Sequence, residues 1–303
     1  MTADILCLGE PLVEFNEAEP GLWCEGFGGD VSNVAVAARR QGASSAIVTR
    51  LGNDGFGDAL MELWRREDVD ASLVERDPVA QTGLYFVRHG PEGHSFEYRR
   101  AGSAAARMTP AQLPLDAIRN ARILHLSGIT QAISADARAT GFAAIDAARE
   151  AGVRVSYDPN LRLSLWPLEE ARETIHRAME RVDIALPGLE DARLLTGLDD
   201  PKEIVEFYRG LGASTVALTL GADGALVAHG DHIETIPSRP ARLVDATGAG
   251  DCFDGAFLAR LLQTEDPWEA ARYAVVAAAL SVESRGAVAP IPTSDRVLAA
   301  LSN

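Results

Sequence analysis

Residues 123–160, ILHLSGITQAISADARATGFAAIDAAREAGVRVSYDPN, contain the pattern that decides the fold. The apolar run 123–126 predicts a strand, and residues 136–151 predict a helix that ends at Gly152. Residues 153–157 then predict a second strand. Two strands separated by a helix of this length form a βαβ unit, so the stretch predicts an α/β protein built on a parallel sheet.

The same alternation extends over the rest of the chain. Further strands are predicted at residues 4–8, 45–50, 184–186 and 215–220, and further helices at 31–41, 56–67, 168–181, 251–263 and 268–281. Clusters of glycine, serine and aspartate follow several of these strands. Because parallel α/β sheets bind ligands outside the carboxyl ends of their strands, these clusters mark the expected position of a site.

One segment interrupts the α/β pattern with shorter, alternating sequences. Residues 81–88 and 94–100 flank the turn Gly90-Pro91-Glu92-Gly93. Alternating runs around a glycine-containing turn are typical of a β-hairpin. This hairpin predicts a small β-sheet beside the main one, with an ordinary surface hairpin as the alternative.

The small sheet is expected to belong to the same domain as the large one. Extended pieces around Pro11 and Pro20 supply further strands, and the chain contains no interdomain linker, repeat or low-complexity segment. We therefore expect a single domain over residues 1–303, with lid strands inserted from residues 10–30 and 81–102.

The composition excludes several classes of protein. The chain has 303 residues, with 44 acidic and 28 basic side chains, hence a formal net charge of −16. An acidic protein lacks the basic surface that binds nucleic acid. No apolar run approaches the roughly 20 residues of a membrane span, and the N-terminal residues lack the basic region of a secretory signal. The cysteines, Cys7, Cys24 and Cys252, are scattered, which predicts reduced thiols in a cytoplasm.

Lysine is nearly absent, since Lys202 is the only one. A P-loop of the Walker type carries a lysine that contacts phosphate, and no glycine-rich stretch here supplies one. Lys202 stands among acidic residues at a predicted helix start, so it is also a poor Schiff-base nucleophile. These features argue against both enzyme classes.

The stretch 243–255, LVDATGAGDCFDG, carries the strongest chemical signal. A β-like run leads through small residues into a helix, so the backbone amides of Gly248, Ala249 and Gly250 can approach a phosphate closely. Asp251 follows in the first helical turn, where a carboxylate stays ionised and can accept a hydroxyl proton as the catalytic base. Phosphoryl transfer requires this combination. The alternative is an aspartate that only caps its helix.

The same stretch resembles the second signature, D-T-x-G-A-G-D, of the ribokinase-like (PfkB) carbohydrate kinases. Other motifs of that family occur along the chain in the same order as in the family. They are GGDVSNVA at 28–35, RLGNDGFG at 50–57, LGADG at 220–224 and RGA at 285–287. The resemblance implies the ribokinase-like fold, which is a three-layer α/β/α architecture with a mostly parallel central sheet and a small β-sheet lid. It also implies a kinase that uses ATP and Mg²⁺.

Within the family, the sugar-side sequences are most similar to 2-keto-3-deoxygluconate kinases. The matching stretches are TGLY at 82–85, YRRAGSA at 98–104 and DPNLRLSLW at 158–166. The resemblance implies a substrate site that includes Gly29, Asn33, Tyr85, Tyr98, Arg100, Ile129, Arg162 and Asp251. Gly29 is expected to allow a close backbone approach, and Asn33 either to bind substrate or to cap its helix.

The chemistry of a ketodeoxy sugar acid agrees with these residue types. Alternation places Phe96, Tyr98 and Arg100 on one face of a strand, with Glu97 and Arg99 on the other. Arg100 and Arg162 can hold a carboxylate through charge-assisted hydrogen bonds, whereas most other arginines are expected to be surface charges.

One acid near the lid has two interpretations. Glu14 aligns with an acid that holds sugar hydroxyls in many members of the family. The alternative is an acid at the edge of the lid with no contact to substrate.

A second group of residues is expected to bind the nucleotide. The resemblance implies contacts at Asn160, Glu190, Thr219, Gly221, Gly224, Thr247, Gly248 and Gly250. The family's N-x-x-E element, which organises Mg²⁺ and phosphates, stands here as Gly188-Leu189-Glu190-Asp191 and lacks its asparagine. Glu190 must therefore act without it, through Mg-ATP, or Asp191 shares the task. The basic residue that often precedes G-A-D-G in the family is also absent. Whether a monovalent cation binds near Asp245 and Gly286 is left open.

The sequence thus predicts a kinase that converts 2-keto-3-deoxygluconate to its 6-phosphate. The alternative inside the family is a fructokinase or another neutral-sugar or nucleoside kinase. Two alternatives have a different function: a non-catalytic sugar-binding sensor and an NAD-binding enzyme. The first βαβ unit lacks G-x-G-x-x-G, which argues against the NAD-binding enzyme. We expect a cytoplasmic protein that binds a sugar acid and ATP, neither nucleic acid nor membrane, and forms a homo-oligomer through the lid sheet.

Overall fold

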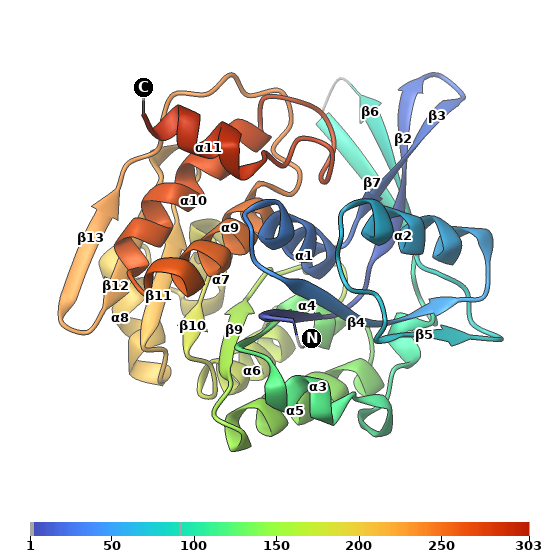
Figure 1. Ribbon diagram of the computed structural model, residues 1–303, viewed down its shortest axis with the longest axis horizontal. Coiled ribbons are helices and arrows are strands. Elements are labelled where there is room, and N and C mark those ends of the chain that lie inside the picture. Colours follow the sequence, from blue (N-terminus) through green and yellow to red (C-terminus); the bar gives the residue numbers. More distant parts are fainter. Residues whose placement is uncertain (1–2, 91–92, 303) are drawn as a thin grey trace.

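The large sheet confirms the predicted α/β fold (Figure 1). The computed structural model describes residues 3–90 and 93–302. Within this part, nine strands pair in the order β13-β12-β11-β10-β9-β8-β1-β4-β5, and the pairs from β11 to β5 are parallel. Their bounds are β1 (Ile5–Leu8), β4 (Ser45–Gly52), β5 (Val74–Asp77), β8 (Ile123–Ser127), β9 (Arg154–Asp158), β10 (Ile184–Ala185), β11 (Thr215–Thr219), β12 (Ala225–His229) and β13 (His232–Ile236).

Strands β12 and β13 form a hairpin that is not among the elements predicted from the sequence. They pair antiparallel at one edge of the sheet and turn at Gly230-Asp231. A two-residue turn containing glycine is typical of a tight hairpin. The signal is therefore present in the sequence, but the flanking strands are only five residues long.

Helices cover both faces of the large sheet, which confirms the three-layer architecture (Figure 1). One face packs against α1 (Asp30–Arg40), α2 (Gly55–Arg66), α9 (Ala249–Thr264), α10 (Pro267–Ser281) and α11 (Ser294–Leu301). The other packs against α3 (Leu115–Asn120), α4 (Gly128–Ala132), α5 (Ala135–Glu150), α6 (Leu168–Met179), α7 (Leu189–Thr196) and α8 (Pro201–Leu211). Short 3₁₀ turns occur at η1 (Ala105–Arg107), η2 (Pro110–Gln112) and η3 (Gly221–Asp223).

Strand β1 shows why two hydrophobic cores form. Ile5 and Cys7 belong to the core under α1 and α9, whereas Leu6 and Leu8 belong to the core under α5 and α6. Successive side chains of a strand point to opposite faces, so an uninterrupted apolar strand contributes to both cores. A strand buried on both faces is what a parallel sheet between helix layers requires.

The small sheet is built from the segments that the sequence analysis identified as extended. Its strands β2 (Leu12–Glu19), β3 (Leu22–Gly28), β6 (Leu84–Gly90) and β7 (Gly93–Arg99) pair in the order β3-β2-β6-β7. The central pair of β2 and β6 is parallel, and the outer pairs are antiparallel. Pro91 and Glu92 of the predicted turn lie outside the described residues. The sheet projects from one side of the body, at the upper right of Figure 1.

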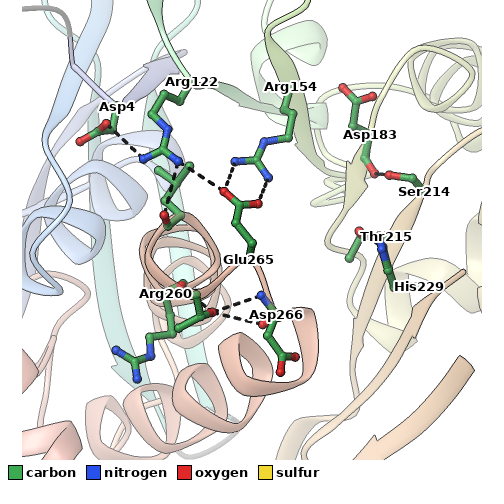
Figure 2. A network of polar contacts seen from close by, with 12 residues as sticks. Asp4, Arg122, Arg154, Asp183, Ser214, Thr215, His229, Arg260, Glu265 and Asp266 are labelled. Atoms are coloured by element: carbon green, nitrogen blue, oxygen red, sulfur yellow. Dashed lines mark hydrogen bonds and ion pairs between the residues drawn. The ribbon is translucent and has the colours of Figure 1, made fainter.

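The far end of α9 is tied to the large sheet by an ion-pair network (Figure 2). Glu265, just after α9, pairs with Arg122 at 3.3 Å and with Arg154 at 3.0 Å. Arg122 lies just before β8, Arg154 begins β9, and Arg122 also lies 3.7 Å from Asp4. Networks of several charges hold an element more firmly than single surface pairs. The helix that starts at the candidate site is therefore anchored at its other end.

Within residues 3–90 and 93–302, no helix combines the length and the apolar character needed to cross a bilayer.

Candidate active site

Two adjoining cavities open at the carboxyl ends of the parallel strands. The first, the acidic cavity, has a volume of about 790 Å³, and its lining includes the carboxyl groups of Glu10, Asp30, Asp158, Asp191, Asp251 and Asp254. The second, the apolar cavity, has a volume of about 590 Å³ and walls that include Phe253, Val275 and Val282. Thr219, Ala246 and Gly250 line both. The two cavities therefore meet at the start of α9.

Asp251 faces the acidic cavity from the first turn of α9. Gly248 caps this helix with φ of +74°, and a Cβ added there would lie 3.1 Å from Ala287, so the turn needs glycine. Asn33 of α1 donates its Nδ2–H to Asp251 Oδ2 at 2.7 Å. Gly29, and not Asn33, occupies the cap position of α1. Asn33 therefore orients Asp251 in this structure, a role that neither sequence alternative included.

Burial is the main influence on the carboxyl groups of the acidic cavity. It raises the pKa of Asp251 to about 7, Asp30 adds to the rise, and the Asn33 hydrogen bond and Arg162 oppose it. Burial and neighbouring carboxylates also raise the pKa values of Asp158 and Asp254. Negative charge gathered in this way favours bound protons or a cation.

The start of α9 presents backbone amides to the junction of the two cavities. The first N–H groups of a helix have no acceptor within the helix and attract anions. Ala249 is one of the three residues whose amides are predicted to contact a phosphate. Its amide already donates a hydrogen bond to the Ala246 carbonyl at 3.2 Å within this turn. The amides of Gly250 and Asp251, the second and third residues of α9, are better placed to meet a phosphate.

Side chains of the small sheet form one wall of the acidic cavity. Phe96 and Tyr98 of β7, and Arg100 just after it, all line the cavity, which confirms the predicted alternation. Glu97 and Arg99 pair with each other at 2.5 Å and are largely exposed.

Tyr85 of β6 completes this wall, and its hydroxyl is already engaged. It donates a hydrogen bond to Glu14, and burial and this carboxylate together raise the pKa of Tyr85. Glu14 is buried but does not line the cavity. The structure thus favours the lid-edge interpretation of Glu14 over a contact with substrate.

The two arginines predicted to bind a carboxylate have different surroundings, although both line the acidic cavity. Arg100 is 9% exposed, and its Nε donates to Glu10 Oε2 at 2.6 Å. Arg162 is 46% exposed, donates to the Leu161 carbonyl at 2.8 Å and lies 3.9 Å from Asp191 Oδ2. Arg162 therefore has the more available guanidinium group.

Gly29, Ile129 and Asn160 also line the acidic cavity. Gly29 has φ of +93°, and a Cβ added there would lie 2.5 Å from the Glu10 carbonyl oxygen. The close approach that it permits is therefore between two segments of this chain. Asn160, expected on the nucleotide side, instead donates its Nδ2–H to Asp30 at 3.0 Å within the acidic cavity.

The apolar cavity contains most of the predicted nucleotide loop. Of the residues predicted to bind nucleotide, it holds Thr219, Gly221, Gly224 and Gly250. A Cβ added to Gly224 would lie 2.1 Å from the Ile236 carbonyl oxygen, and its φ is +103°, so only glycine is tolerated. Thr247 and Gly248 line the acidic cavity instead.

Glu190 is a predicted site residue that the structure places outside both cavities. Its side chain is 83% exposed and pairs with Arg193 at 3.0 Å along α7. Asp191 lines the acidic cavity and accepts the Leu161 amide at 2.8 Å. Neighbouring residues of a helix point in different directions, so only one of the two acids can face the cavity. The structure contradicts the placement of Glu190 and favours the alternative, Asp191.

Asp245 organises the turn that precedes α9. Its Oδ1 accepts the amide and hydroxyl of Thr247 at 2.9 and 2.7 Å, and its Oδ2 accepts the Gly286 amide at 2.9 Å. A monovalent cation beside Asp245 and Gly286 stays a prediction.

Four acids that line the acidic cavity are not among the site residues predicted from the sequence. Asp30 and Asp158 lie inside motifs that were recognised, and Asp254 is one turn beyond Asp251 on the same helix. Glu10 follows Gly9, two residues after the end of β1. Their positions at strand ends and on one helix face were readable signals, but burial, which gives them their chemistry, is not visible in the sequence.

Comparison with known proteins now identifies the family. The family model described as pfkB family carbohydrate kinase matches residues 3–294 of the chain. The chain belongs to this family. A carbohydrate kinase, as the motifs predicted, is therefore favoured over a sugar-binding sensor and an NAD-binding enzyme.

Curated members of the PfkB family that resemble the chain act on different sugars. The chain is 36% identical to 2-dehydro-3-deoxygluconokinase of Thermoproteus tenax, over 95% of this chain and 91% of that protein. It is 33% identical to Fructokinase-1 of Oryza sativa subsp. japonica, over 97% of this chain and 96% of that protein. The chain is a sugar kinase, and these relatives leave its substrate open.

Solved structures confirm the ribokinase-like fold. A PfkB protein from Polaromonas sp. JS666 has a TM-score of 0.90 at 32% identity, covering 98% of this chain and 99% of that one. A putative ribokinase II from E. coli, solved in complex with ATP and Mg²⁺, has a TM-score of 0.91 at 25% identity and 99% coverage of both chains.

Proposed function

We propose that the protein transfers the γ-phosphoryl group of ATP to the terminal hydroxyl of a sugar acid, so that 2-keto-3-deoxygluconate becomes its 6-phosphate. The observation that carries the proposal is that one cavity brings Arg100 and Arg162 together with Asp251. Guanidinium groups recognise a carboxylate through charge-assisted hydrogen bonds. Asp251, whose pKa of about 7 suits a general base near neutral pH, is available for the hydroxyl.

Asp251 accepts the hydroxyl proton while that oxygen forms a bond to the γ-phosphorus and the bond to the bridging oxygen of ADP breaks. Asn33 holds the carboxylate of Asp251 during this step. The amides of Gly250 and Asp251 stabilise the charge that develops on the phosphoryl oxygens. The wall formed by Tyr85 and Tyr98 limits access of water, consistent with a small sheet that acts as a lid.

We place the adenine in the apolar cavity and the phosphates at the junction near Gly250. A hard divalent cation fits the surroundings of that junction, because Asp254 Oδ2 is buried without a hydrogen-bond partner among the described residues. Within those residues, no three Asp, Glu, His or Cys side chains stand close enough to hold a metal by themselves. Asp191 or Asp254 would therefore share Mg²⁺ with water and phosphate oxygens. When bound, Mg²⁺ neutralises phosphate charge.

The test of this function is a comparison of sugars. Initial rates with ATP are measured for 2-keto-3-deoxygluconate, 2-keto-3-deoxygalactonate, fructose and ribose. The proposal expects the highest kcat/KM for a ketodeoxy acid. A clear preference for fructose would keep the kinase activity but reject the sugar acid.

A fructokinase is the second candidate, because the Arg100 guanidinium is already neutralised by Glu10 and a rice fructokinase is 33% identical. Arg162→Ala separates the two candidates. For a sugar acid, loss of this cation raises KM by about tenfold or more, whereas the KM for fructose changes little. Arg149→Ala, an exposed arginine of α5, is the matched control.

Two further expectations remain proposals. A cytoplasmic location is supported by Cys7, Cys24 and Cys252, which are free thiols in the structure. A homo-oligomer formed through the small sheet is supported by the aromatic side chains on the face of that sheet opposite the acidic cavity.

A further inference from the structure

A buried ion pair links the large sheet to the small sheet at the wall of the acidic cavity. Glu10 lies two residues after the end of β1, and Arg100 directly follows β7. Arg100 Nε donates to Glu10 Oε2 at 2.6 Å, and Arg100 Nη2 lies 2.5 Å from the same oxygen. The Glu10 side chain is fully buried, so this pair is largely shielded from water. A buried charge is stable only when its partner stays in place.

A second contact holds the Glu10 carboxylate from the same loop. Ser103 donates its hydroxyl to Glu10 Oε1, and its amide donates to the Arg100 carbonyl at 3.0 Å. Arg100 and Ser103 both belong to the YRRAGSA stretch at 98–104, so this motif binds one carboxylate twice. A Cβ added to Gly83 would lie 2.9 Å from Glu10 Oε1, which shows that the pocket around this carboxylate is closely packed.

The pair leaves one nitrogen of Arg100 with unused donor capacity. Glu10 engages Nε and Nη2 of Arg100, whereas Nη1 has no hydrogen bond to the described residues, and Arg100 lines the acidic cavity. The same cavity contains carboxylates that would compete for a free guanidinium, among them Asp30 and Asp251. An Arg100 released from Glu10 would therefore turn toward another acid and away from a ligand.

We propose that Glu10 is a positioning residue that holds Arg100 so that its Nη1 donates to the sugar, and that Glu10 thereby sets the selectivity for acid over neutral sugars. The identity of the sugar rests on the function proposed above. Glu10 acts through Arg100 and makes no contact with the reacting atoms. Burial raises the pKa of Glu10, while the charge of Arg100 and the hydrogen bonds from Ser103 and Arg100 lower it, which agrees with a carboxylate held by both side chains.

The experiment is a double-mutant cycle of Glu10→Ala and Arg100→Met, with KM and kcat measured for 2-keto-3-deoxygluconate and for fructose. Each single variant is expected to raise the KM for the acid by about tenfold or more, with a much smaller change for fructose. The double variant is expected to equal Arg100→Met alone, because Glu10 has nothing left to position. Arg99→Met, on the exposed face of β7, is the matched control and should change neither KM.

Two conservative variants separate positioning from mere structural support. Glu10→Gln keeps an oxygen acceptor for Arg100 and should recover most of the affinity that Glu10→Ala loses. Ser103→Ala loosens the carboxylate without removing its charge, and keeps the test available if Glu10→Ala does not fold. A lower Tm with an unchanged ratio of the two KM values would overturn the proposal. Additive effects in the cycle, or tighter binding of the acid by Glu10→Ala, would overturn it as well.

Failure of the proposed function gives a different result from failure of this inference. If the wild type uses fructose and rejects the acid, the proposed function fails, and selectivity for acids fails with it. The cycle is then measured with fructose. Non-additivity there still supports the positioning of Arg100 by Glu10, whereas additivity removes it.

Discussion

Asp251 must satisfy two opposing physical demands at one carboxyl group. A general base has to be ionised, whereas burial beside Asp30 favours the neutral form. The hydrogen bond from Asn33 and the charge of Arg162 act in the opposite direction and restore part of the ionisation. The resulting pKa of about 7 is close to the optimum for proton transfer near neutral pH.

Asp251→Asn is expected to lower kcat by about 10²- to 10⁴-fold, because the variant cannot accept a proton. Nucleotide binding in the neighbouring apolar cavity should be retained. For the wild type, kcat/KM should fall as the pH falls through 7, where Asp251 becomes protonated. Steady-state kinetics between pH 5.5 and 9 measure both effects, with Asp295→Asn on α11 as the control. A kcat close to that of the wild type would remove Asp251 from the role of base.

The same substitution should make the fold more stable. In the unfolded chain Asp251 ionises near its ordinary pKa of 3.8, whereas in the folded chain it does so near 7. Between these values the folded state binds more protons, so the wild type loses stability as the pH rises. The amide that replaces this carboxyl group in Asp251→Asn carries no charge at any pH. The Tm of the variant should therefore exceed that of the wild type by a margin that grows from pH 5 to pH 7 and then levels off, measured by differential scanning fluorimetry.

At the scale of elements, the site depends on glycines that let two segments approach. Gly29 lets the turn before α1 pass the segment that joins β1 to β2, where Glu10 lies. Its φ of +93° is strained for any other residue. This turn therefore fixes the position of the small sheet relative to Asn33 and Asp251.

Gly29→Ala is expected to destabilise the protein by about 2 kcal/mol or more, because the added Cβ would meet backbone atoms of Glu10 and Pro11 at 2.5 and 2.7 Å. Gly210→Ala is the matched control, since Gly210 lies in α8 with nothing within 4 Å of the added Cβ. The control should be neutral or stabilise by roughly 0.5–1 kcal/mol. Urea unfolding measures both, and equal stabilities for the two variants would contradict this account of Gly29.

The elements that the sequence predicted well share a strong local signal. The helix at 136–151 appears as α5 and the strand at 153–157 as β9, each within about one residue, because apolar periodicity and a terminal glycine mark their ends. Asp251 was selected in the same way, since glycines and a helix start surround it. Glu10 and Asp254 were not, because their importance comes from burial and from partners far away in the sequence. Arg100 was correctly placed at the cavity, but its pairing with Glu10 depends on the packing of two sheets.

At the scale of the whole molecule, the face of the small sheet opposite the cavity is rich in aromatic side chains. Phe15 stacks on Phe86 with centroids 5.4 Å apart, and Trp23 meets Phe86 edge-on at 5.5 Å. These three side chains are only partly buried, and Phe15 also packs edge-on against Phe56 of α2 at 5.8 Å. An exposed apolar face and an open sheet edge commonly mark an interface, and a formal net charge of −16 opposes non-specific association.

We therefore expect the protein to form a homodimer through this face, in which each copy covers the aromatic cluster of the other. Trp23→Glu places a charge in that interface and should shift the sedimentation coefficient to that of a 32.2 kDa monomer. Leu298→Glu, an exposed leucine of α11 on a different part of the fold, should leave the dimer intact. Because β6 and β7 also form a wall of the acidic cavity, the monomeric variant should show a higher KM for sugar with a nearly unchanged KM for ATP. A wild type that sediments as a monomer at micromolar concentration would contradict the interface, and equal KM shifts for both substrates would contradict its link to the sugar site.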